Sequence, residues 1–452
     1  AFITGCKVGV GGTVSIKGEH SLGGIAGGMS NAKGGYIDSC TVGAYTTIDR
    51  IAVGGNGVEE SPKHGTAIGG LVGFTQDSKD DTSPLTTTFS GTSAFNGTIT
   101  VSVEATNPST DSDGKISCIG GIVGDMGSGA NFASGSNVTV GGNINITLAA
   151  ANVGGVVGRT NKATFIGKFN VAPNMSTENA ENVGGFIGKN IGTVYILADT
   201  TDKLENTTVG ALNGTEITIG GKIKGTSEVG GFIGVNNSGS TLNIGSNVAN
   251  AKPYKSGTLT ITITASVTGS GDNVGGIVGK NEGDDENTQD NDYATIDIVK
   301  GTIEQNGAII GANNVGGIIG LNDGLLTTGG GEADTTIGGV TLSEEQQNKI
   351  KNLSINNTGS VTGTGDYVGG VVGKLDSPSA LRTEDSGKGA IAGTFTNSGN
   401  VSGGKFVGGS LGYVGKNVTI TAKNNVATLF VNDGQVTATG YYAGGSIGVL
   451  VG

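Results

Sequence analysis

The stretch of this 452-residue chain best suited to binding chemistry is the acidic segment "DDENTQDND" at 284–292. It carries five carboxylates within nine residues: Asp284, Asp285, Glu286, Asp290 and Asp292. Ca²⁺ takes six to eight oxygen ligands, often from closely spaced Asp and Asn side chains, so these residues are a candidate calcium site. Their spacing is not that of an EF-hand loop, which needs a glycine and a terminal glutamate at fixed offsets. A solvated charged loop is the alternative interpretation.

The residues that support other kinds of catalysis do not form a recognisable pattern. His20 and His64 lie in different repeats and neither belongs to a metal-binding motif, so the sequence predicts no zinc site. The carboxylates concentrate in variable segments and form no repeated column suited to acid–base catalysis. Tryptophan is absent, although nine tyrosines are available for stacking on sugars. We therefore expect no enzymatic activity, and we keep a carbohydrate-active enzyme or a glycan-binding module as the alternative.

The three cysteines, Cys6, Cys40 and Cys118, are too few to build a disulfide framework in a chain of this size. We interpret them as small buried apolar residues. A bridge between Cys6 and Cys40 is the second interpretation.

The composition restricts the classes of partner. The formal net charge is −12, so no basic surface is available to neutralise phosphates, and we expect no nucleic-acid partner. No apolar run approaches eighteen residues, so we expect no transmembrane segment. The chain begins at Ala1 and stops within patterned sequence, which favours a processed form or a segment of a longer protein.

The sequence is built on an internal repeat, a glycine-rich pentapeptide of the form Gly-Gly-x-aliphatic-Gly, such as "GGIVG" at 275–279. It occurs eleven times, with spacings of 30 to 53 residues. Its fourth position is always aliphatic, and the residue that follows it varies freely. The first glycines of the eleven copies are Gly23, Gly69, Gly120, Gly154, Gly184, Gly230, Gly275, Gly316, Gly369, Gly408 and Gly444.

The surrounding residues favour short strands. Apolar residues alternate with Thr, Ser and Asn in segments such as 98–105 and 258–267, and segments such as 357–370 read as strand, turn and glycine strand. The segment 341–353 is the exception, because Ser343 and Gln346 have capping-box spacing and predict a short helix.

A repeat unit of this kind can bury its apolar face only by stacking on its neighbours. We therefore predict an all-β protein, a single continuous parallel β-helix or β-solenoid over residues 1–452, with loop inserts between the eleven repeats. Glycines in every copy would let successive coils approach closely, since a Cβ in such a column would clash with its own copies. The sequence leaves open whether each repeat forms one coil or two.

The pentapeptide resembles the GLUG motif, and "GGLVG" at 69–73 is close to its literal form. This motif occurs in large bacterial surface proteins, including adhesins, and in the repeat region of some immunoglobulin A-cleaving metallopeptidases. The resemblance covers about residues 22–448 and implies an extracellular, secreted or surface-displayed bacterial protein. The catalytic HExxH of the peptidases is absent from this chain, so the resemblance does not imply their activity.

These observations together predict a non-enzymatic structural or adhesive protein of the cell surface. The solenoid would be a rigid scaffold, and its variable inserts would bind surface proteins or glycans. Self-assembly into a homo-oligomer, filament or surface layer through the solenoid ends or the loops is a related expectation. Calcium is the one cofactor that the sequence suggests.

Overall fold

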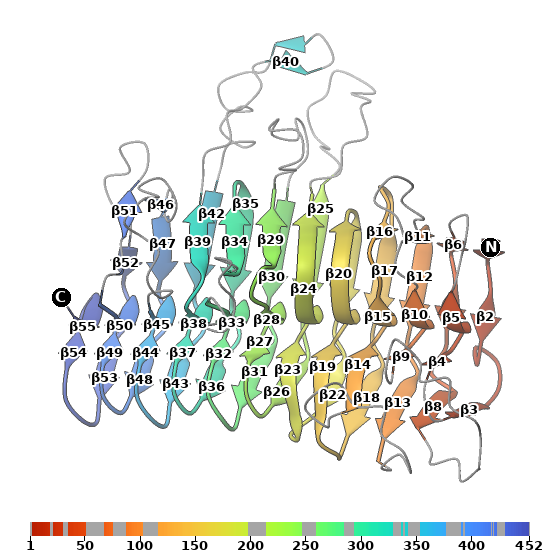
Figure 1. The fold of residues 1–452 in the computed structure, drawn as a ribbon, viewed down its shortest axis with the longest axis horizontal. Coiled ribbons are helices and arrows are strands. Elements are labelled where there is room, and N and C mark those ends of the chain that lie inside the picture. The colour runs from red at the N-terminus through yellow and green to blue at the C-terminus, as the bar shows by residue number, and fades with distance from the viewer. Residues whose placement is uncertain are drawn as a thin grey trace.

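The computed structural model describes most of the chain as one continuous stack of parallel strands (Figure 1). The described residues are 2–18, 21–29, 35–50, 67–75, 87–102, 116–197, 214–245, 259–283, 293–328, 336–337, 340–341, 353–376, 390–391, 394–416, 418, 420–422 and 430–451. They contain strands, turns and no helix. The predicted all-β parallel solenoid is therefore confirmed.

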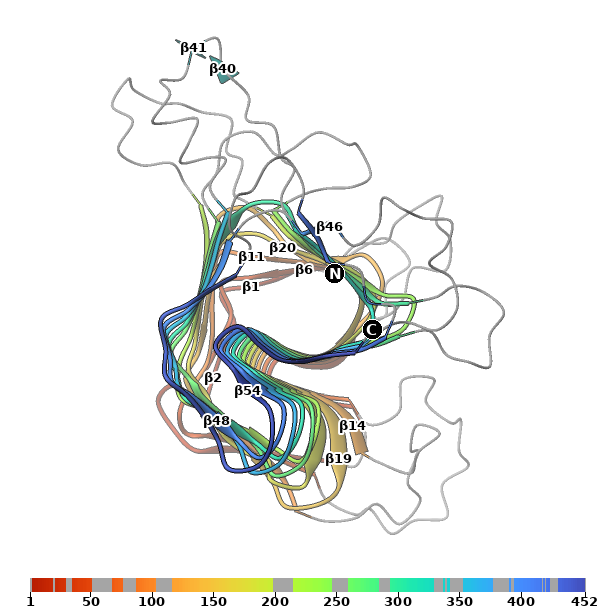
Figure 2. The same ribbon diagram turned by 90° about the vertical axis from the view of Figure 1, so that its left-hand side faces the viewer.

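Each repeat forms one coil with five strand positions, which we name a to e in chain order. Viewed along the stack, the eleven coils superpose, so equivalent strands lie above one another (Figure 2). The sequence left open one or two coils per repeat, and the structure has one. At a strand spacing of about 4.8 Å, ten steps between coils give a rise of roughly 50 Å.

The strands of positions b, c and d form three parallel eleven-stranded sheets. Position b consists of β2 (Lys7–Val8), β7 (Thr41–Val42), β12 (Thr92–Phe95), β17 (Asn137–Val140), β21 (Lys168–Val171), β25 (Thr215–Ile219), β30 (Leu259–Ile263), β35 (Gly301–Gln305), β42 (Leu353–Asn357), β47 (Thr394–Asn397) and β52 (Phe430–Asn432). Position c consists of β3 (Val14–Gly18), β8 (Thr46–Arg50), β13 (Thr98–Val101), β18 (Asn143–Ile146), β22 (Asn174–Ser176), β26 (Lys222–Gly225), β31 (Ser266–Gly269), β36 (Ile309–Gly311), β43 (Val361–Gly363), β48 (Val401–Gly403) and β53 (Val436–Ala438).

Position d carries the first glycine of each pentapeptide. Its strands are β4 (Leu22–Gly23), β9 (Ile68–Gly69), β14 (Ile116–Gly120), β19 (Ala150–Gly154), β23 (Ala180–Gly184), β27 (Val229–Gly230), β32 (Val274–Gly275), β37 (Val315–Gly316), β44 (Val368–Gly369), β49 (Val407–Gly408) and β54 (Ala443–Gly444). Every first glycine pairs with the first glycine of the next copy, for example Gly230 with Gly275 and Gly275 with Gly316. The sequence repeat and the structural repeat are therefore in register throughout.

Positions e and a belong to a fourth sheet, and in two coils a single strand covers both positions. Position e consists of β5 (Ala26–Met29), β10 (Val72–Thr75), β15 (Val123–Met126), β28 (Ile233–Asn236), β33 (Val278–Asn281), β38 (Ile319–Asn322), β45 (Val372–Leu375), β50 (Leu411–Val414) and β55 (Ile447–Leu450). Position a consists of β1 (Phe2–Thr4), β6 (Gly35–Asp38), β11 (Thr87–Ser90), β16 (Ala130–Phe132), β29 (Thr241–Ile244), β34 (Thr295–Ile298), β39 (Leu325–Thr328), β46 (Ala390–Ile391) and β51 (Thr421–Ala422). The two strands that cover both positions are β20 (Val157–Phe165) and β24 (Ile187–Ile196). An antiparallel pair, β40 (Thr336–Ile337) and β41 (Val340–Thr341), stands outside the stack (Figure 1).

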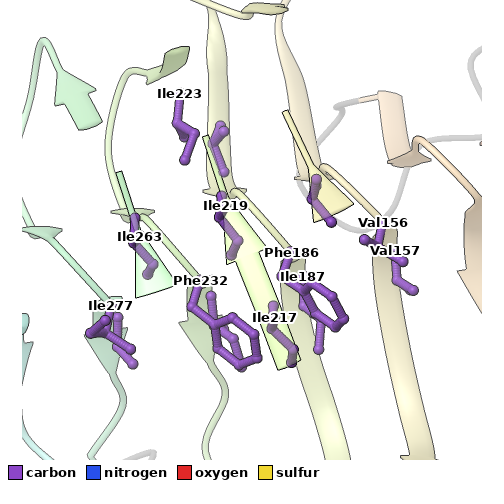
Figure 3. Close-up of a cluster of buried hydrophobic side chains, with 14 of the residues drawn as sticks. Val156, Val157, Phe186, Ile187, Ile217, Ile219, Ile223, Phe232, Ile263 and Ile277 are labelled. Atoms are coloured by element: carbon purple, nitrogen blue, oxygen red, sulfur yellow. The ribbon is translucent and has the colours of Figure 1, made fainter. Parts of the chain in front are cut away.

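The core is a set of aliphatic and phenylalanine ladders that run along the stack. The third and fourth residues of the pentapeptide both point into it, as Phe186 and Ile187 do (Figure 3). Phe186 stacks on Phe232 of the next coil, with ring centroids 5.0 Å apart. Burying such columns removes apolar surface from water along the whole rod, which is the main force that holds the coils together.

Asparagine also lines the core, although the alternation of Asn with apolar residues favours the outer face for it. Asn190, Asn236, Asn281 and Asn322 are at most 2% exposed and form a column at the end of position e. The Nδ2 groups of Asn190, Asn236 and Asn281 each donate to the Oδ1 of the next coil's asparagine at 2.8 Å. The Nδ2 of Asn322, at the end of the column, donates to the carbonyl of Gly324 at 3.1 Å. A second such ladder joins Asn357, Asn397 and Asn432. Because every amide has a partner one coil away, these buried polar groups help to keep the coils in register.

The strands predicted from alternating residues are present as β13 and β30. Most of the segment predicted to be helical lies outside the described residues. Ile99 and Val101, and likewise Leu259, Ile261 and Ile263, point into the core. Of the segment predicted to be helical, 342–352 lies outside the described residues, and Leu353 begins β42.

The segments outside the described residues fall at three of the five corners of the coil. The e–a corner includes 30–34, 76–86, 284–292 and 377–389, the a–b corner includes 198–213, 246–258 and 423–429, and the c–d corner includes 51–66 and 103–115. The b–c and d–e corners stay short in all eleven coils. Variation in repeat length is thus confined to particular corners, as expected of a solenoid whose ladders must stay intact.

Candidate functional site

Besides the core ladders, the most distinctive repeated feature is a column of residues at the turn before position d, two residues before the first glycine. We call it the turn column. From the third coil onward every member has a positive φ, between 52° and 71°, which is the left-handed region. Its members are Cys118, Asn152, Asn182, Glu228, Asn273, Asn314, Tyr367, Phe406 and Tyr442.

The middle of the turn column is a ladder of amides with one carboxylate. Asn273 donates to Glu228 Oε1 at 2.9 Å, and Asn314 donates to Asn273 Oδ1 at 2.8 Å. Asparagine suits this position because it adopts the left-handed conformation more readily than other residues with a Cβ. Burial raises the pKa of Glu228, and the hydrogen bond from Asn273 opposes this shift by favouring the ionised form.

The last three members of the turn column are aromatic. Tyr367 and Phe406 stack with centroids 5.1 Å apart, and Phe406 and Tyr442 with centroids 5.3 Å apart. Tyr413, from position e, meets Tyr367 at an angle of 75°. The Nζ of Lys374 lies 5.7 Å from the Tyr367 ring centroid and 5.8 Å from that of Tyr413. We call these five residues the aromatic cluster.

Large side chains are rarely held at positive φ, so the aromatic cluster carries backbone strain that asparagine at the same positions would largely avoid. Ring stacking and the cation offset part of this cost. Tyr441 and Tyr442 are also 70% and 62% exposed. Strain together with exposed aromatic area is typical of binding surfaces.

A second charged feature lies next to the aromatic cluster, where position e ends. Glu282, Asp323 and Asp376 occupy equivalent places on three successive coils. Each backbone N–H donates to the carbonyl of the ladder asparagine one coil earlier, which is Asn236, Asn281 and Asn322 respectively. Lys280 pairs with Glu282 at 3.3 Å and Lys374 with Asp376 at 2.7 Å. The coil of Asp323 has Leu321 at the position of these lysines. Burial, and secondly repulsion from Asp376, raise the pKa of Asp323 to about 6.

The raised pKa of Asp323 predicts a pH-dependent stability. The carboxyl group loses its proton near pH 4 in the unfolded chain but only near pH 6 in the folded chain. Stability should therefore fall as pH rises from about 4 to about 6 and then level off. We expect Asp323→Asn to raise the free energy of unfolding at pH 7 by up to about 2 kcal/mol, and with it the Tm. At pH 3.5 the variant and the parent should have the same Tm. Melting curves across this range measure the difference.

Asp433→Asn is the matched control, since Asp433 is exposed at the b–c corner, between β52 and β53. Its Tm difference from the parent should stay flat over the same range. An Asp323→Asn protein whose Tm difference did not change between pH 3.5 and pH 7 would contradict the assignment.

The structure does not place the five residues of the candidate calcium site. Asp284, Asp285, Glu286, Asp290 and Asp292 all lie outside the described residues, as do His20 and His64. The chain enters this insert from Gly283, directly after Glu282, and returns at Tyr293. Within the described part of the chain, no group of three or more His, Cys, Asp or Glu side chains is placed to hold a metal ion. The calcium site thus remains a prediction.

The three cysteines are reduced in this structure, and the interpretation of them as buried apolar residues holds fully for two. Cys40 and Cys118 are buried, whereas Cys6 is half-buried against the core. Cys118 is also the first member of the turn column with a positive φ.

Sequence reasoning missed the turn column, although it left a visible signal. The residue two before the first glycine reads Asn in four of the eleven copies and aromatic in the last three. A column of asparagines is what a repeated left-handed turn selects. The change to Tyr, Phe and Tyr marks the place where the surface changes from polar to aromatic.

Comparison with known proteins places this chain in no established group: no family model, no curated protein and no solved structure matches it. The described residues form no helix, and so none that is long and apolar enough to span a membrane.

Proposed function

We propose that this chain is a non-enzymatic structural and adhesive module of a bacterial cell surface. In this proposal the eleven stacked coils are a rigid scaffold, and the inserts at three corners are the recognition surface. The observation that carries it is the contrast between corners: the b–c and d–e corners stay short in every coil, while the others accept segments of very different length. Recognition residues commonly lie on variable loops held by a rigid frame. The resemblance to the GLUG motif supports an extracellular location.

The partners in this proposal are proteins or glycans of another surface, or further copies of this chain. Calcium, if bound, would be held by the insert at 284–292, where Asp and Asn oxygens are dense.

Replacing residues 284–292 with a Gly-Asn turn tests the proposal. Each residue of a surface loop adds little closure entropy, so the shortened protein should keep its far-UV circular dichroism and its Tm within about 2 °C. Its binding to immobilised glycans and matrix proteins, or its self-association by native mass spectrometry, should fall at least tenfold. A shortened protein that folds, binds and assembles like the parent would remove this insert from the recognition surface.

Glycan binding by the aromatic cluster is the second candidate. It rests on a specific observation, the strained and partly exposed rings of Tyr367, Phe406 and Tyr442 beside Tyr413 and Lys374. Aromatic rings with nearby polar groups suit sugars, which have both apolar faces and hydroxyls. Tyr413→Ala together with Tyr442→Ala separates the two candidates. If these changes abolish glycan binding and insert shortening does not, the aromatic cluster is the binding surface.

A further inference from the structure

Cys6 and Cys40 occupy the same place on the first and second coils. Lys7 pairs with Thr41 in parallel register, and the N–H of Thr41 donates to the carbonyl of Cys6 at 2.8 Å. The two cysteines are therefore direct neighbours across adjacent strands, which puts their Cα atoms about 4.8 Å apart. This separation lies within the range of about 4.4–6.8 Å that disulfides span.

The local backbone turns the Cys40 side chain toward the first coil. A residue with positive φ precedes each cysteine, Gly5 at 62° and Ser39 at 54°. The thiol of Cys40 lies 3.4 Å from the carbonyl oxygen of Asp38 in its own coil and 3.8 Å from that of Ile3 in the first coil. Cys40 is fully buried, whereas Cys6 is half-buried and accessible to small reagents.

We propose that Cys6 and Cys40 form a redox-controlled pair that closes a disulfide between the first and second coils. Both are reduced in this structure. The Cys6 thiolate attacks a small-molecule disulfide, forms a mixed disulfide and releases one small thiol. The Cys40 thiolate then attacks the Cys6 sulfur, expelling the second small thiol, which takes up the proton that Cys40 loses. Two protein thiols are thereby oxidised and one small-molecule disulfide is reduced to two thiols.

A bond between these two cysteines needs a small adjustment of the strands. In a parallel pair the Cβ atoms are also near 4.8 Å apart, slightly more than the 3.5–4.5 Å usual in disulfides. Position a of the first coil is largely exposed, with Phe2 at 83%, and Val10 after position b is 50% exposed. Strain left in the bond would make it easy to reduce, which is the behaviour of a regulatory disulfide and not of a purely structural one.

The chemistry of the second step gives the pair a characteristic pH dependence. Burial raises the pKa of the Cys40 thiol, so its thiolate is scarce at neutral pH. Formation of the mixed disulfide on Cys6 should be faster than its resolution by Cys40, and resolution should accelerate as pH rises from 7 to 9. The oxidised coils would then be held together covalently, and amide hydrogen exchange in 2–18 should slow at least tenfold.

The full chain, equilibrated with excess oxidised glutathione at pH 8 and digested without reduction, tests the proposal. We expect a peptide that joins Cys6 to Cys40, an intact mass lower by two hydrogen atoms, and full reversal by reduced glutathione. Cys6→Ser should abolish the linked peptide, and Cys118→Ser should leave it unchanged. A protein that instead keeps a glutathione adduct on Cys6, or links Cys6 between two chains, would overturn the proposal. The linked peptide, the intact mass and the reversal are measured on the unmodified protein, so these three readouts do not depend on the folding of either variant.

Discussion

Replacing Ile309 with aspartate is expected to disrupt the stack at its eighth coil, whereas the same replacement at Ile310 is expected to be tolerated. The two residues are consecutive in β36, but Ile309 is 0% exposed and Ile310 is 41% exposed. Ile309 stacks between Val267 and Val361 of the adjacent coils. A carboxylate there would lie in a buried apolar column between two valines, and burying it should cost about 4 kcal/mol or more.

The identity of the two wild-type side chains makes this comparison a matched one. Residue type, strand and substitution are the same, and only the direction of the side chain differs. Circular dichroism melting should show a large loss for Ile309→Asp and a change within about 0.5 kcal/mol for Ile310→Asp. In a solenoid each coil contacts only its neighbours, so hydrogen exchange should rise first around β31, β36 and β43. Equal effects of the two substitutions would refute the assigned inward face.

Lys280, which follows the pentapeptide of the seventh coil, shows why such controls need the structure. The free variation of this position in the sequence predicts an outward side chain that tolerates any substitution. In the structure Lys280 is half-buried and pairs with Glu282. An acidic residue there would face Glu228, Glu282 and Asp323, so it is a poor choice for a neutral control.

The fold was predictable because eleven copies of one pattern constrain it more than any single copy does. A glycine found at the same phase in every repeat indicates a column where no Cβ fits, and an invariant aliphatic position indicates a column facing inward. Both follow from stacking, which requires each coil to bury its face on the next. The number of coils per repeat was not predictable, because a spacing of 30 to 53 residues is compatible with one large or two small coils.

The buried asparagine ladders were not predictable, because strict alternation fails next to the third glycine. Counting by two from the buried Ile187 places Asn190 on the outside. In the structure Lys189 is the half-exposed residue and Asn190 is 0% exposed. The backbone at Gly188 is turned toward the previous coil, because a Cβ on it would lie 2.5 Å from the backbone of that coil. Only glycine fits there, and the turn places Asn190 on the inner face. Polar residues with a repeating partner one coil away can therefore be core residues in a solenoid.

The stacked rings of the aromatic cluster show in the sequence only when the copies are aligned on their first glycine. Tyr367, Phe406 and Tyr442 are 39 and 36 positions apart in the sequence, because the lengths of the intervening segments differ. Only the register of position d brings them into one stack. The residues of the candidate calcium site pose the opposite case, since they are adjacent in sequence but lie outside the described coils.

Replacing Gly230 with alanine is expected to destabilise the protein by about 3 kcal/mol, although it adds a single methyl group. A Cβ on Gly230 would collide with the carbonyl of Ile233, lying 2.6 Å from its carbon, and would lie 2.8 Å from the amide nitrogen of Gly279 on the next coil. All of these are backbone atoms, so relief requires moving strands and not rotating side chains. The same clash recurs at the first glycine of nearly every copy, which explains why this residue is glycine in all eleven.

Gly220→Ala supplies the contrast that isolates this effect. A Cβ on Gly220 would make ordinary contacts, 3.5 Å from Thr264 Oγ1 and 3.6 Å from the Ala172 Cβ, and Gly220 has no positive φ. Alanine there lowers the entropy of the unfolded chain without strain, so a stabilisation of about 0.5 kcal/mol is expected. Urea denaturation of both variants measures the two signs. If Gly230→Ala were as stable as the parent, the backbone clash within the pentapeptide and with the next coil would not be the reason for the glycine column.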